Sequence, residues 1–174
     1  MERRIGDGVV RLVRGDITEI EVDAFVYDIT PDVKLGSGYG GAIQQRGGIA
    51  IQKELDAIGS CPVGEAVITG AGLLKAKNII HVNGPKFREE DEEGKLRRAT
   101  LSALKAASDK GFERIALPPI GTGLYQVPMD LCARVMLDTV TQHLRNETTL
   151  REVLFVLPDT REYGPFEKNL EEVQ

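Results

Sequence analysis

The 174-residue chain carries 22 Lys plus Arg against 27 Asp plus Glu, a net charge of −5. This balance disfavours nucleic acid as a partner, because nucleic-acid binders usually present a basic face. The length predicts one domain, residues 1–174. Cys61 and Cys132 lack metal-ligand spacing, so we expect a reduced, cytoplasmic protein. No export signal or membrane-spanning apolar run is expected either.

The first half of the chain alternates between strand and helix patterns. Apolar runs predict strands over residues 9–13 and 23–27, the second covered on both faces. Helical spacing predicts a helix over residues 42–58, interrupted at Gly47 and Gly48. Two further strands are predicted over residues 64–70 and 78–83.

The second half continues the same alternation after a very polar stretch. Residues 86–95 include five consecutive acidic residues, which predict a solvated loop rather than a metal site, because hard-cation loops intersperse carboxylates with turn residues. The remaining expected elements are a helix closed by Gly111, a strand over 114–118, a helix from Pro128 to His143, a strand over 152–157 and a helix from about Pro165. This order predicts a three-layer α/β/α sandwich with a mixed, largely parallel central sheet.

A glycine-rich loop follows the second predicted strand. Glycines stand at positions 36, 38, 40 and 41, so backbone N–H groups there can approach a ligand closely. A helix is expected to begin at Gly41 or Ala42, and a helix N-terminus favours an anion. The loop therefore reads either as a phosphate cradle or as a flexible surface turn.

The same glycines match the spacing of the dinucleotide fingerprint, from Gly36 through Gly38 to Gly41. That fingerprint needs its first glycine directly after a strand and an acidic residue at the end of the next strand. Here the preceding strand is expected to stop near Tyr27, and the region twenty residues on is helical. The sequence disfavours a nicotinamide cofactor, and no cofactor is expected.

A second glycine-rich loop, Gly121-Thr122-Gly123, also follows a predicted strand, and Gly15-Asp16-Ile17-Thr18 follows the first strand. In order and spacing these segments resemble the macrodomain family of ADP-ribose-binding modules. The resemblance covers nearly the whole chain, through residues 15–18, 23–26, 35–43, 63–66, 79–81 and 119–125.

The resemblance implies roles for particular residues. Asp16 would accept a hydrogen bond from the adenine amine, with the Ile17 N–H serving a ring nitrogen; the alternative for Asp16 is a turn cap. Two sets of loop residues would hold the diphosphate from opposite sides: Gly38, Tyr39 and Gly41 in the first loop, and Ile120, Gly121, Thr122, Gly123, Leu124 and Tyr125 in the second.

The rings expected at the two ends of the ligand leave alternatives open. The Tyr125 side chain would also pack against the distal ribose, or would instead pack on a helix. Pro158 stands where the family often stacks an aromatic ring on adenine, and Tyr163 and Phe166 are close enough in sequence to substitute.

Two departures from the family bear on catalysis. Many members carry asparagine, two alanines and asparagine where this chain has residues 27–30, so Thr30 would keep only one hydrogen bond to the distal ribose. Members that hydrolyse ADP-ribosyl-protein bonds by the best-known route place an aspartate where Gly40 stands, and glycine has no carboxylate to position or activate the attacking water. Asp28 is a nearby carboxylate that equally fits a turn cap.

No other side chain stands out as catalytic. His81 lies within an apolar strand pattern, typical of a buried structural histidine, and His143 suits a helix C-terminus. The cysteines show no partner that would make a nucleophile.

The sequence leaves two functions open, with a third behind them. The chain is either a metal-independent binding module for free ADP-ribose or ADP-ribosylated protein, or a hydrolase that removes an ADP-ribosyl or acyl group from such a ligand. The departures favour binding, or, as the third reading, a structural domain that has lost its ligand. No membrane partner is expected.

Overall fold

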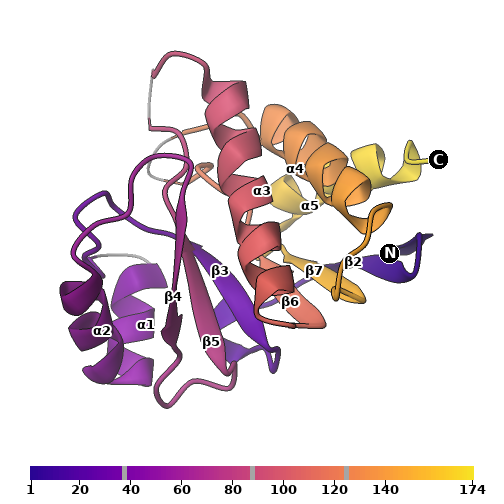
Figure 1. Ribbon diagram of the computed structural model, residues 1–174. Helices are drawn as coiled ribbons and strands as arrows, with labels where there is room; N and C mark the ends of the chain where they lie inside the picture. The colour runs from indigo at the N-terminus through magenta and orange to yellow at the C-terminus, as the bar shows by residue number, and fades with distance from the viewer. Residues whose placement is uncertain (37–38, 87–88, 124–125) are drawn as a thin grey trace.

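The computed structural model describes residues 1–36, 39–86, 89–123 and 126–174 (Figure 1). Its strands are β1 (Glu2–Ile5), β2 (Gly8–Val13), β3 (Ala24–Asp28), β4 (Ala66–Gly70), β5 (Asn78–Val82), β6 (Arg114–Leu117) and β7 (Glu152–Val156). Its helices are a short 3-10 helix (Ile17–Glu19), α1 (Tyr39–Gly47), α2 (Ala50–Ile58), α3 (Glu92–Asp109), α4 (Met129–Leu144) and α5 (Thr160–Glu171).

The strands of the described residues form one seven-stranded sheet in the order β1-β2-β7-β6-β3-β5-β4. The four inner pairs are parallel, whereas β1 and β4 run antiparallel at the two edges. The predicted mixed, largely parallel sheet is therefore confirmed. The carboxyl ends of β2, β7, β6, β3 and β5 meet at one edge, where ligands of such sheets bind.

Helices cover both faces of this sheet (Figure 1). Within β3, Phe25 packs in the core beneath α1 and α2, and its neighbour Val26 packs in the core beneath α3, α4 and α5. Ile79 and Ile80 of β5 alternate in the same way. This period of two explains why buried strands read as continuous apolar runs, and it confirms the α/β/α sandwich.

One additional strand and two helix starts differ from the predictions. β1 was not expected, because its Glu-Arg-Arg start lacks an apolar pattern and pairs only at the sheet edge. α1 begins at Tyr39, earlier than expected. The predicted start of the last helix at Pro165 is wrong: the Asp159 carboxylate accepts the Glu162 N–H at 3.1 Å and caps a helix that contains Pro165.

No helix in the described part of the chain is long and apolar enough to cross a membrane.

Candidate ligand-binding cleft

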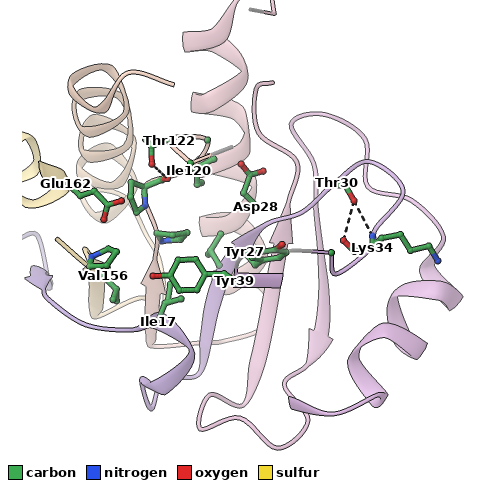
Figure 2. Close-up of a pocket in the computed structure, with 17 residues that line it drawn as sticks. Ile17, Tyr27, Asp28, Thr30, Lys34, Tyr39, Ile120, Thr122, Val156 and Glu162 are labelled. Carbon is green, nitrogen blue, oxygen red and sulfur yellow. Dashed lines mark hydrogen bonds between the residues drawn. The ribbon is translucent and has the colours of Figure 1, made fainter. Parts of the chain in front are cut away.

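A cavity of about 380 Å³ opens at the carboxyl ends of the parallel strands (Figure 2). Its wall comes from the 3-10 helix, the ends of β3 and β7, the segment after β3, the start of α1, the loop after β6 and the first turn of α5. The lining residues are Ile17, Val26, Tyr27, Asp28, Thr30, Lys34, Gly36, Tyr39, Pro118, Pro119, Ile120, Gly121, Thr122, Gly123, Val156, Pro158 and Glu162.

The cavity brings together most of the described residues that the sequence nominated. Eight of them line it: Ile17, Thr30, Tyr39, Ile120, Gly121, Thr122, Gly123 and Pro158. Asp16 and Gly41 lie beside the cavity wall without lining it. The nominated residues Gly38, Leu124 and Tyr125 lie outside the described residues.

Asp16 caps the 3-10 helix. Its Oδ1 accepts hydrogen bonds from the Thr18 N–H at 2.9 Å and the Thr18 hydroxyl at 2.7 Å, and its Oδ2 pairs with Arg46 at 2.8 Å. Partial burial raises the pKa of Asp16, but the hydrogen bonds from Arg46 and Thr18 outweigh it and lower the pKa overall. The carboxylate is therefore ionised, and its side chain stays 38% exposed.

The first glycine loop leads into the N-terminus of α1. The first N–H groups of a helix have no partner within the helix and carry the positive end of its dipole. Tyr39, Gly40 and Gly41 form this first turn, and Gly36 lines the cavity just before it. This end of the helix has the donors that an anionic ligand needs.

The ring of Tyr39 extends along the cavity towards the side that carries Ile17 and Val156 (Figure 2). Partial burial raises the pKa of the Tyr39 hydroxyl, and the negative charges of Asp16 and Glu162 raise it further. The phenol therefore stays protonated and can donate a hydrogen bond.

The second glycine loop faces the first across the cavity. Gly121 adopts a φ of +79°, and a Cβ there would lie 2.7 Å from Val127 Cγ2, so only glycine fits. The Thr122 hydroxyl donates to the Pro119 carbonyl at 2.9 Å, which holds the loop closed. A Cβ on Gly123 would meet no atom of the described residues within 4 Å.

Asp28 is a largely but not fully buried carboxylate in the cavity wall. It accepts the Gly84 N–H at 3.1 Å and lies 3.7 Å from the Lys86 ammonium. Burial raises the pKa of Asp28, while the charge of Lys86 and the N–H groups of Gly84 and Gly121 partly offset that rise. Asp28 thus ties the loop after β5 to the second glycine loop through backbone N–H groups far away in sequence.

The segment after β3 is fixed by its own side chains. The Thr30 hydroxyl donates to Asp32 at 2.6 Å and accepts the Lys34 N–H at 3.3 Å. Gln52 of α2 accepts the Leu35 N–H at 2.9 Å and donates to the Val33 carbonyl at 3.1 Å. The Thr30 side chain is therefore already engaged at the far end of the cavity.

Neither histidine lines the cavity. His81 Nε2 lies 2.9 Å from the Thr69 hydroxyl, and burial lowers the pKa of His81 to about 3. His143 Nε2 lies 2.8 Å from Thr148, far along α4. Both positions agree with the structural interpretation of these side chains.

Neither cysteine lines the cavity. Burial raises the pKa of the Cys61 thiol to about 11 and holds that of Cys132 well above its usual range, so both stay protonated and neither is activated as a nucleophile. In the described part of the chain, no three His, Cys, Asp or Glu side chains gather to hold a metal ion.

The two aromatic alternatives for the adenine site do not line the cavity. Phe166 is buried against Phe155, with ring centroids 5.0 Å apart. Tyr163 lies beneath the Arg14 guanidinium, 5.4 Å from the ring centroid. The aromatic side chains that line the cavity in the described chain are Tyr27 and Tyr39.

Sequence reasoning missed several lining residues. Pro118 and Val156 stand at the ends of β6 and β7, so their position after buried strands was a usable signal. Tyr27 stands at the end of the predicted strand over 23–27 and carried the same signal. Lys34 had no such signal, and Glu162 was missed because the last helix was predicted to start too late.

The family model for the Macro domain matches residues 30–136. A macro domain-containing protein of Caldanaerobacter subterraneus is 40% identical over 170 residues, which cover 94% of this chain and 97% of the relative. O-acetyl-ADP-ribose deacetylase 1 of Pantoea vagans is 35% identical over 167 residues, which cover 92% of this chain and 98% of that protein.

Solved structures agree with this match. A macrodomain of Oceanobacillus iheyensis with ADP has a TM-score of 0.93 at 28% identity, covering 98% of this chain and 94% of the other. A Trypanosoma brucei macrodomain in complex with ADP-ribose has a TM-score of 0.87 at 26% identity, covering 92% of this chain and 68% of the other. The predicted resemblance is confirmed, and the chain belongs to the macrodomain family.

Proposed function

We propose that this protein binds ADP-ribose, free or attached to protein, in the cleft at the carboxyl ends of the sheet. The observation that carries the proposal is the opposition of the α1 N-terminus and the second glycine loop across one cavity of about 380 Å³. Backbone N–H groups on both sides suit a diphosphate. The similar macrodomains of O. iheyensis and T. brucei were solved with ADP and ADP-ribose.

The residues at the two ends of the cavity indicate which way round ADP-ribose would bind. Ile17, Val156 and Pro158 form an apolar end that suits adenine, with the Tyr39 ring alongside. Thr30 and Lys34 rim the opposite end, where the distal ribose would lie. Between these ends, the diphosphate would be bound by the two glycine loops, including Gly38, Leu124 and Tyr125.

Backbone N–H groups would bind the negatively charged diphosphate. The Lys34 ammonium, at the edge of the cavity, is paired with Asp56 at 2.8 Å. We therefore place the diphosphate against N–H groups rather than against a lysine. We also propose that residues 1–174 act as one domain in the cytoplasm, which the free, buried thiols of Cys61 and Cys132 support.

Titration calorimetry with ADP-ribose, ADP, AMP and NAD tests the proposal. We expect ADP-ribose to bind most tightly, ADP next and AMP weakly, because each step removes contacts from one end of the cleft. No heat with any of the four ligands would reject ADP-ribose binding.

Replacing Asp16 by alanine should weaken binding of both ADP and ADP-ribose by about 1–3 kcal/mol, the scale of a hydrogen bond to a charged group. The change removes the exposed carboxylate edge that we assign to the adenine amine. Calorimetry on the folded variant measures the loss.

The control is Glu19→Ala, because Glu19 shares the Arg46 partner at 3.3 Å but does not cap the 3-10 helix. This variant should bind normally. If Asp16→Ala also binds both ligands normally, Asp16 is only the turn cap.

A second candidate function is removal of an acyl or ADP-ribosyl group from ADP-ribose derivatives. The relative named O-acetyl-ADP-ribose deacetylase 1 favours it. Incubation with O-acetyl-ADP-ribose and with a mono-ADP-ribosylated protein, followed by measurement of the released product, tests it. Gly40 and Thr30 lead us to expect binding without turnover; turnover would make the protein a hydrolase.

A further inference from the structure

Tyr27 and Gly40 occupy the same corner of the cleft. Tyr27 belongs to β3 and lines the cavity, and Gly40 is the second residue of α1. A Cβ built on Gly40 would lie 2.4 Å from the Tyr27 hydroxyl oxygen and 3.2 Å from Cζ. Atoms cannot approach that closely, so the phenol takes the space that any side chain at position 40 would need.

The hydroxyl of Tyr27 consequently lies against the first turn of α1. Tyr27 lies towards the part of the cleft that leads to Thr30 and Lys34, opposite the side that carries Ile17 and Val156 (Figure 2). This places a phenol oxygen at the distal-ribose end of the ligand direction described above.

The ring is held in place from behind. Tyr27 pairs with His81 of β5 in the parallel sheet, and the two rings meet edge to face at 6.2 Å between centroids. His81 is fully buried. A ring packed in this way presents its hydroxyl with little loss of side-chain entropy on binding.

The other side chains at this end have other roles. The Thr30 hydroxyl serves Asp32 and the Lys34 backbone, and the Lys34 ammonium serves Asp56. A phenol has one donor and two acceptor lone pairs, so it can bond a ligand hydroxyl in addition to a protein group.

We propose that Tyr27 is the residue that distinguishes ADP-ribose from ADP in this protein, through a hydrogen bond between its phenol and a hydroxyl of the distal ribose. The assignment rests on the proposed function. It also explains why position 40 is glycine here: the polar group at this corner comes from β3 and not from α1.

The test compares Tyr27→Phe with wild type for two ligands, ADP-ribose and ADP, by titration calorimetry. Phenylalanine keeps the ring against His81 and removes only the hydroxyl. We expect ADP-ribose affinity to fall roughly 3- to 10-fold, the size of one hydrogen bond, and ADP affinity to stay within about 2-fold. Tyr39→Phe is the matched control, because a hydroxyl near the adenine end affects both ligands equally.

Unchanged ADP-ribose affinity in Tyr27→Phe would overturn the assignment, and so would an equal loss for both ligands. Failure of the wild-type protein to bind either ligand instead rejects the proposed function itself.

A Gly40→Ala variant provides an independent test, since alanine suits a helix and the added Cβ must displace the phenol. In the wild-type background it should reduce ADP-ribose affinity about as much as Tyr27→Phe. In the Tyr27→Phe background it should cause little further loss, because the hydroxyl is already gone. Fully additive losses would contradict a shared corner.

Discussion

Replacing Gly123 by valine should reduce ADP-ribose affinity at least about 100-fold, which corresponds to roughly 2.7 kcal/mol. Gly123 lines the cavity in the second glycine loop, and a Cβ there would meet no atom within 4 Å among the residues that the structure describes. The valine side chain would therefore enter open space beside the loop, where the diphosphate has to approach the backbone. The fold should tolerate the change, because the residue does not adopt a positive φ.

Calorimetry measures the affinity and thermal denaturation checks the fold. Gly164→Val is the matched control: Gly164 is exposed in α5, also has open space at its Cβ, and does not line the cavity. It should bind as wild type does. Binding by Gly123→Val within about threefold of wild type would place the diphosphate elsewhere.

The second large effect concerns acid stability. Burial lowers the pKa of His81 from 6.5 to about 3, so the unfolded chain takes up a proton that the folded protein refuses. Above pH 6.5 the histidine is neutral in both states, and its contribution to the free energy of unfolding is fully present. As the pH falls from 6.5 towards 3, about 4–5 kcal/mol of that free energy is lost.

Urea unfolding at several pH values measures this loss. His81→Gln, which cannot be protonated, should remove most of the decline between pH 6.5 and 3, whatever its stability at neutral pH. His143→Gln is the comparison, because His143 is only half-buried and its pKa is lowered less. An unchanged pH dependence in His81→Gln would assign acid sensitivity to other groups.

The pattern of apolar residues in the sequence was sufficient to predict the three layers of this fold. Runs such as 23–27 and 78–83 are apolar on both sides of the strand because helices cover both faces of the sheet. Local pattern was insufficient for β1, which has a polar start and is specified by its antiparallel pairing with β2. It also misplaced α5, because the capping bond from Asp159 decides the start of that helix.

Some features of the candidate site could likewise be predicted from short segments of sequence, and others could not. Glycine loops after buried strands are a local signal, and the loop glycines 36, 121 and 123 indeed line one cavity. The stacking alternatives were not decidable locally: Phe166 sits in the core and Tyr163 beneath Arg14, although both are near Pro158 in sequence. Both side chains pack on the same core cluster, because residues three apart on a helix share a face, and the packing of α5 on the sheet turns that face away from the cavity.

The sequence by itself determined the α/β/α class, the two glycine loops and the macrodomain resemblance, because strand and helix periodicity and glycine chemistry are properties of short segments. Only the tertiary structure decided that Tyr27 fills the space beside Gly40, and that Asp28 lies against Gly84 and Lys86. These contacts depend on the distances between β3, α1 and the loop after β5. Packing of the whole sheet sets those distances, and no local pattern records them.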